Sequence, residues 1–130
     1  MNRVHIRDIA VGGGAPLCLI AGPCVIESRD LVLRTADRIA DIARRLGMPA
    51  VFKSSFEKAN RTSLDAFTGL GRDEALHLLE EAGRASGLPL LTDVHTVEDV
   101  AAAAAVVDVL QIPAFLSRQT ELLLAAGSSG

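Results

Sequence analysis

The chain has 130 residues, with 13 Lys and Arg against 16 Asp and Glu, so its formal net charge is −3. This length suits one domain, and an apolar share of 49% provides for a buried core. The mildly acidic balance argues against nucleic acid or membrane as a partner. No apolar run reaches the roughly 20 residues that span a bilayer, and the N-terminus lacks the apolar segment of a signal peptide. Two cysteines, Cys18 and Cys24, are too few for a disulfide scaffold, so we expect a cytoplasmic protein.

Residues 1–16 predict a β-hairpin, because apolar alternation leads into three glycines and a proline. From residue 17 to residue 126, short apolar runs alternate with amphipathic helices. The pattern Gly-x-Pro-strand occurs at Gly47 and again at Gly87, which is the repeat expected of a βα unit. The predicted elements are a strand over 17–21, a helix from Ser28 to about 46, a strand over 50–52, a helix over 72–86, a strand from 90, a helix over 97–105 capped by Thr96, a strand over 106–112, and a helix from a Ser117 cap to about 126.

Strands that alternate with helices indicate a parallel sheet with helical cover. A closed (β/α)₈ barrel takes roughly 250 residues, about twice this length. The chain is therefore either a small open α/β sheet or one half of a barrel. Residues 127–130 read as a flexible polar end, which fits a truncation as well as a natural terminus.

The carboxyl ends of the predicted strands are polar, although the strands themselves are apolar. In parallel α/β folds the active site forms at these ends. Ligands are therefore expected beside Cys24, beside Lys53, beside Asp93 and His95, and beside Gln111.

The loop that begins at Lys53 brings cations and hydroxyl groups together. Lys58 and Arg61 follow Lys53 within nine positions, with Asn60 and Thr62 beside them. Phosphate binding needs positive charge and directional donors, so this loop indicates an anion site. The alternative is a solvated surface loop.

The other candidates each have a structural alternative. Cys24 is either a metal ligand, a nucleophile or a small buried hydrophobic residue. His95 is a ligand, a base, a donor or a structural histidine, and Asp93 needs a partner if it is buried. His77 is expected on the surface. The chain has no His-x-x-x-His or Cys-x-x-Cys pair, so the sequence by itself gives no complete metal site.

Four segments together resemble one enzyme family, the 3-deoxy-D-manno-octulosonate-8-phosphate synthases. They are Ala21-Gly-Pro-Cys-Val-Ile-Glu-Ser28, Lys53-Ser-Ser-Phe-Glu-Lys-Ala-Asn-Arg-Thr-Ser63, Leu91-Thr-Asp-Val-His95 and Val109-Leu-Gln-Ile-Pro-Ala-Phe-Leu-Ser-Arg-Gln-Thr120. The resemblance covers nearly the whole chain, and its most specific part is Lys58-Ala-Asn-Arg61. It implies an α/β fold in which an N-terminal β-hairpin precedes about four βα units of a truncated (β/α)₈ TIM barrel.

The resemblance also implies an activity, a homotetramer and site residues. The family condenses phosphoenolpyruvate with arabinose 5-phosphate and water in lipopolysaccharide biosynthesis. By motif, phosphoenolpyruvate contacts would come from Lys53, Lys58, Gln111, Pro113 and Ala114. Arabinose 5-phosphate would contact Asn60, Arg61 and Thr62, Arg118 would reach a phosphate from a neighbouring subunit, and Asp93 and His95 would share the rim.

The resemblance further implies that Cys24 is one ligand of a divalent metal ion, with the other ligands beyond residue 130. The chain departs from the family at Thr68-Gly69-Leu70-Gly71, where an Arg-Gly-Pro-Gly stretch is usual. Two other readings stay open. One is a relative of the heptulosonate-phosphate synthases, and the other is a non-catalytic half-barrel fragment.

Overall fold

The computed structural model describes residues 2–57 and 70–130. An α/β order runs through them, as the alternation of apolar runs and amphipathic helices predicts. The elements are β1 (Arg3–Ile6), β2 (Ile9–Gly12), β3 (Leu19–Ala21), α1 (Arg29–Leu46), β4 (Ala50–Lys53), α2 (Arg72–Ser86), β5 (Leu90–Asp93), α3 (Val97–Ala104), β6 (Val109–Gln111), a 3₁₀ turn η1 (Ala114–Leu116) and α4 (Thr120–Gly127).

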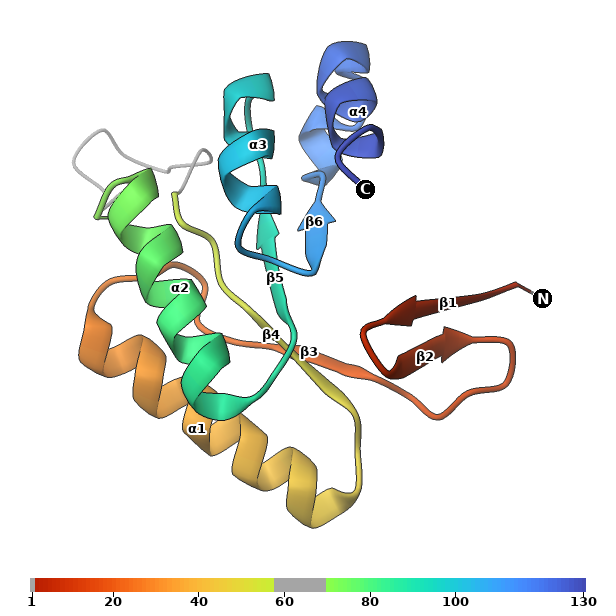
Figure 1. The fold of residues 1–130 in the computed structure, drawn as a ribbon, viewed down its shortest axis with the longest axis vertical. Coiled ribbons are helices and arrows are strands. Elements are labelled where there is room, and N and C mark those ends of the chain that lie inside the picture. The colour runs from red at the N-terminus through yellow and green to blue at the C-terminus, as the bar shows by residue number, and fades with distance from the viewer. Residues whose placement is uncertain (1, 58–69) are drawn as a thin grey trace.

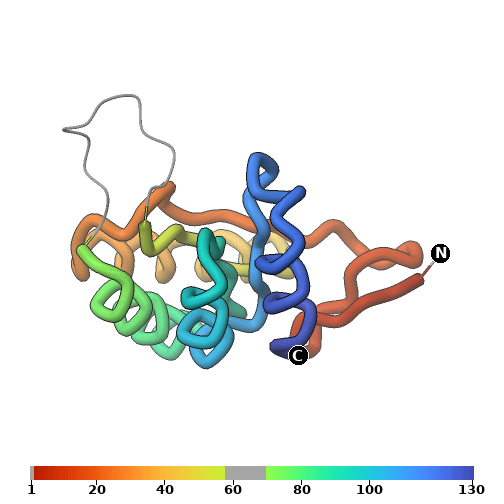
Figure 2. Tube along the Cα trace, turned by 90° about the horizontal axis from the view of Figure 1, so that it is seen from above, coloured from red at the N-terminus to blue at the C-terminus, as the bar shows by residue number. Residues whose placement is uncertain are grey.

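The strands form an antiparallel hairpin, β1–β2, and a four-stranded parallel sheet in the order β3-β4-β5-β6. Helices α1, α2 and α3 contact the sheet through β4, β5 and β6. They form one helical layer over the sheet, and the hairpin lies at the end of the molecule away from α2 (Figures 1 and 2). Both the hairpin and the parallel sheet are confirmed predictions.

The core lies between the sheet and the helices. Phe52, Phe56, Leu79 and Val94 are fully buried there, and Val32 of α1 packs into the same cluster. The amphipathic helix predicted for this segment thus packs an apolar face into the core.

Leu46, an apolar residue of the same helix, lies outside this core and is 68% exposed. It is the last residue of α1, which stops at Gly47 in the left-handed conformation, φ 61°. The helix therefore ends before its last apolar side chain can reach the sheet.

Three predicted boundaries were wrong, each for a local hydrogen-bonding reason. Leu17 is 84% exposed, and the ladder of β3 starts when Leu19 N donates to Pro49 O. Val106 N and Val107 N donate back to Ala103 O and close α3, so β6 is shorter than 106–112.

The last boundary concerns Ser117, which does not cap α4. Its amide donates to Ala114 O at the end of η1, and Gln119 is the residue before the helix. At the chain end, Gly127 belongs to α4, and the Ser128 and Ser129 hydroxyls donate to the carbonyls of Leu124 and Ala126.

The hairpin is joined to the amino end of the sheet by one ion pair. Arg7 Nε lies 2.7 Å from Asp108 Oδ1, and Asp108 Oδ2 accepts from Leu90 N at 2.8 Å. Arg7 itself has φ 51°, in the tight turn between β1 and β2. Among the helices described, none is long and apolar enough to cross a membrane.

Candidate active site at the carboxyl ends of the strands

Hydrogen bonds between neighbouring strands fix the carboxyl edge of the sheet. Ser54, just after β4, is fully buried, and its hydroxyl donates to Pro23 O at 2.8 Å. Thr92 of β5 is also fully buried and donates from Oγ1 to Ser54 O at 2.8 Å. Val94 N donates to Gln111 O at 3.1 Å, which joins β5 to β6. The ends of the strands are therefore held in fixed positions relative to one another.

Close approach at Gly22 completes this edge. A Cβ atom built on Gly22 would lie 1.8 Å from the Lys53 carbonyl oxygen, so a larger residue cannot be accommodated without a shift of the backbone. The glycine thus allows the chain after β3 to pass close to Lys53 at the end of β4. Cys24 follows two residues later.

Asp93 and His95 form the polar pair of this edge. His95 Nε2 lies 3.0 Å from Asp93 Oδ2, and the side chains are only 10% and 12% exposed respectively. The ring of Phe56 meets the imidazole edge-on, with ring centroids 5.8 Å apart. The prediction that a buried Asp93 would need a partner is confirmed, and the partner is the other residue predicted on this strand end.

The electrostatics of the pair favour its charged form. Burial disfavours the Asp93 carboxylate, but interactions with His95 and Ser55 outweigh it and lower the pKa of Asp93. The hydrogen bond to Asp93 raises the pKa of His95 against the opposing effect of burial, and the charges of Asp93, Asp99 and Glu57 add to the increase. His95 therefore holds a proton more readily than an ordinary histidine.

Two buried atoms of the pair have no hydrogen-bond partner in the structure as described, namely Asp93 Oδ1 and His95 Nδ1. Buried polar atoms are nearly always satisfied by protein, water or ligand. The pair therefore keeps one acceptor oxygen and one ring nitrogen that its own hydrogen bond does not use.

The remaining predicted residues fall into three groups. Gln111 lies opposite Asp93 in the register of β5 and β6, Lys53 ends β4 half-buried, and Pro113 is buried just before η1. Ala114 and Arg118 are exposed, at the start of η1 and just beyond it. The other predicted contacts, Lys58, Asn60, Arg61 and Thr62, lie outside the described residues, as do Thr68 and Gly69.

Sequence reasoning assigned no role to Ser55 in the Lys53 segment, and it missed Asp99. Ser55 is buried and makes an isolated β-bridge with Val25. Asp99 is buried and forms a capping box with Thr96 at the start of α3. The spacing Thr-x-x-Asp was the signal that could have shown its role.

A metal centre is not assembled by the residues described. Among them, no group of three or more His, Cys, Asp and Glu side chains could hold a metal ion, and Cys24 is exposed. Catalytic zinc-type sites use about three protein ligands. These residues alone thus do not fit a bound metal.

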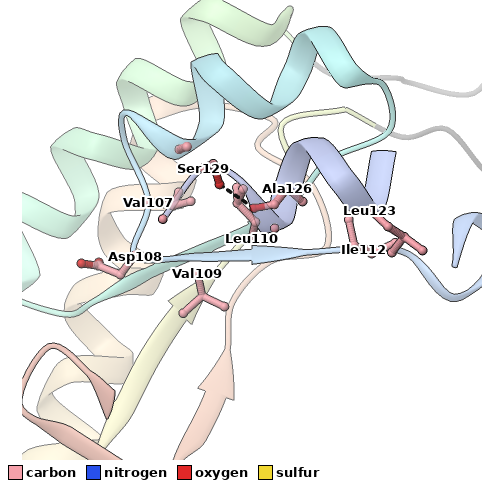
Figure 3. Close-up of a pocket in the computed structure, with 11 residues that line it drawn as sticks. Val107, Asp108, Val109, Leu110, Ile112, Leu123, Ala126 and Ser129 are labelled. Atoms are coloured by element: carbon pink, nitrogen blue, oxygen red, sulfur yellow. Dashed lines mark hydrogen bonds between the residues drawn. The ribbon is translucent and has the colours of Figure 1, made fainter. Parts of the chain in front are cut away.

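A groove of about 550 Å³ lies away from this edge, beside β6 and α4. Val109 and Ile112 line it from β6 and the segment after it, and Leu123 and Ala126 line it from α4 (Figure 3). None of the predicted site residues belongs to it. It lies beside β6, which has no second neighbouring strand among the residues that the structure describes.

Comparison with known proteins agrees with the motifs. A protein of Trichlorobacter lovleyi named 2-dehydro-3-deoxyphosphooctonate aldolase is 55% identical over 129 residues, covering 99% of this chain and 47% of the relative. Proteins with the same name from a Synechococcus species and from Geotalea daltonii are 54% and 46% identical, with 98% and 100% of this chain and 45% and 48% of the relatives covered. The chain thus spans about half the length of these curated relatives. The profile described as the DAHP synthetase I family matches residues 2–130, and the chain belongs to this family.

Proposed function

We propose that this chain carries the substrate-binding half of an enzyme that condenses phosphoenolpyruvate with arabinose 5-phosphate and water, forming 3-deoxy-D-manno-octulosonate 8-phosphate and phosphate. The observation that carries the proposal is the buried Asp93–His95 pair at the same strand ends as Lys53 and Gln111. The names of the relatives support this substrate pair.

Both substrates are anions, so their site needs fixed cations and donors. Among the described residues, Lys53 and Arg118 supply positive charge, and the raised pKa of His95 adds a third cation when its ring is protonated. In the proposed site Lys53 meets phosphoenolpyruvate, with Gln111, Pro113 and Ala114 lining its pocket. The proposal extends by resemblance to Lys58 for phosphoenolpyruvate, and to Asn60, Arg61 and Thr62 for arabinose 5-phosphate.

We also propose that the four-stranded sheet is half of a (β/α)₈ barrel. Strands β3 and β6 each have one neighbour in the sheet as described, and the groove beside β6 leaves apolar side chains uncovered. Apolar parallel sheets are normally covered and continued. In the same proposal the protein is a cytoplasmic homo-oligomer, Arg118 reaches a neighbouring subunit, and Cys24 gives one metal ligand.

The family profile and the curated relatives point to sugars of different length. Heptulosonate and octulosonate have seven and eight carbons, and phosphoenolpyruvate supplies three of them, so the aldose phosphate has four carbons or five. The Lys58-Ala-Asn-Arg61 segment favours the five-carbon sugar. Calorimetric titration with arabinose 5-phosphate and with a four-carbon aldose phosphate separates these alternatives.

Replacement of Lys53 tests the proposed site. Lys53→Ala should weaken phosphoenolpyruvate binding by roughly ten- to a hundredfold, since a hydrogen bond to a charged group contributes about 1.5–3 kcal/mol. Arg84→Ala is the matched control, because it removes a cation from an exposed pair with Glu80 on α2. Equal affinity of Lys53→Ala and the unmodified chain, or no binding of either substrate at millimolar concentration, would contradict the proposal.

A further inference from the structure

The turn between β5 and α3 is organised by the carboxylate of Asp99. Its Oδ2 accepts from His95 N at 3.1 Å and from Thr96 N at 2.9 Å. In return Thr96 Oγ1 accepts from Asp99 N at 3.3 Å. Asp99 itself is only 7% exposed, and the bonds that its carboxylate accepts are part-buried and charge-assisted.

A cation partly balances the buried charge. Arg72 Nη1 lies 3.6 Å from Asp99 Oδ1 and comes from the first turn of α2. One oxygen of Asp99 thus faces the turn, while the other faces the neighbouring helix. The carboxylate joins the starts of α2 and α3 at the point where the chain leaves β5.

The position of the imidazole depends on this turn. His95 Nε2 reaches Asp93 Oδ2 at 3.0 Å, while Phe56 contacts the ring from the segment after β4. The side chain can hold both contacts only if its backbone stays in place. The backbone amide of His95 is held by Asp99 alone among the bonds described.

We propose that Asp99 is a positioning residue, whose carboxylate holds the β5–α3 turn so that the His95 imidazole stays on Asp93 in the substrate site. The importance of this position for ligands rests on the proposed function, but the geometric claim does not. Besides Asp99, the acidic groups around the ring are Asp93 on β5 and Glu57 after β4, and Glu121 of α4 lines the cavity beside His95.

The test compares three variants by NMR of the ligand-free chain. Asp99→Ala removes the acceptor and the charge, Asp99→Asn keeps an acceptor oxygen and removes the charge, and Glu98→Gln removes an exposed charge one residue away. Two signals are followed: hydrogen exchange of the His95 and Thr96 amides, and the ¹⁵N shifts and titration of the His95 ring. The Phe52 amide, which donates to Pro89 O in the sheet, reports global opening.

Asp99→Ala should speed exchange of the His95 and Thr96 amides roughly tenfold or more relative to Phe52, and should shift the ring signals of His95. Asp99→Asn should leave most of the amide protection but lower the titration midpoint of His95, because one nearby negative charge is lost. Glu98→Gln should change neither signal.

Unchanged His95 signals in Asp99→Ala, or equal changes in Glu98→Gln, would overturn the proposal. If circular dichroism shows Asp99→Ala to be unfolded, Asp99→Asn provides the test instead. An unchanged titration midpoint of His95 in Asp99→Asn then overturns the proposal. Failure of the unmodified chain to bind phosphoenolpyruvate would refute the proposed function and leave these signals as they are.

Discussion

Gly22→Ala is expected to damage both the fold and the proposed site, because it forces β3 away from β4. The new Cβ would lie 1.8 Å from the Lys53 carbonyl oxygen and 2.8 Å from the carbonyl carbon, and both are backbone atoms that cannot rotate away. The two segments must separate by more than 1 Å to reach an ordinary contact of about 3.4 Å or more.

The structure indicates the size of this effect. Separation at Gly22 strains the Ser54 hydroxyl bond to Pro23 O and the bond from Ile26 N to Ser55 O. Each such bond contributes about 1 kcal/mol, and overpacking typically costs about 1–3 kcal/mol. We therefore expect the free energy of unfolding to fall by roughly 2–4 kcal/mol.

Urea unfolding followed by circular dichroism measures this change. Gly127→Ala is the matched control, since nothing lies within 4 Å of a Cβ built on this helical glycine. It should leave stability unchanged or raise it by up to about 1 kcal/mol. A Gly22→Ala variant that unfolds within about 0.5 kcal/mol of the unmodified chain, which is the usual range for a harmless surface change, would refute the reasoning.

The remaining predictions concern pH, association and activity. Because the fold raises the pKa of His95, protonated His95 contributes to the free energy of unfolding. This contribution is complete below the ordinary histidine pKa of about 6.5 and is lost as pH rises through the raised pKa. Because the fold lowers the pKa of Asp93, its ionised carboxylate also contributes to the free energy of unfolding. This contribution is complete above the ordinary aspartate pKa of about 3.9 and is lost as pH falls through the lowered pKa. His95→Gln should therefore flatten the loss of stability as pH rises above about 6.5 in urea titrations, and a slope equal to that of the unmodified chain would contradict this. The chain should self-associate through the edges of β3 and β6 that pair with no strand among the described residues, and a stable, cooperatively unfolding monomer in sedimentation would count against it. This chain alone should bind divalent metal weakly and lack synthase activity, and turnover on the order of 1 s⁻¹ with added metal would disprove that.

Much of the fold could be predicted because local signals agree with one another. Ser28 accepts from Leu31 N as the expected cap of α1, and Gly47 and Gly87 end α1 and α2 in the left-handed conformation. Thr96 caps α3 as predicted. The errors arose where apolar residues continue past a hydrogen-bonded boundary, as at Leu17 and Val106, since periodicity does not record which amide is already used.

The site could be predicted less completely. The sequence predicted Asp93, His95 and Gln111 at one edge, because the carboxyl ends of parallel strands lie at the same edge of a sheet. It could not show that Nε2 of His95 faces Asp93, since a ring orientation depends on packing against Phe56. Asp99 was missed because its effect passes through the backbone of a turn rather than through a side chain at a strand end.

The polar groups at the carboxyl edge of the sheet are held by different parts of the chain, and this separates the proposed anion contacts from the proposed metal ligand. Asp93 and His95 are fixed within one strand-turn-helix segment, and the neighbouring strands of the same sheet support it. Cys24 follows a different strand, and the described residues place no second and third metal ligand around it. In the proposed function, anion binding and metal binding therefore depend on different groups of the protein. The proposed anion contacts come from the strand ends and from the loop after β4, so we expect this chain to keep weak affinity for a substrate phosphate even if it shows no turnover.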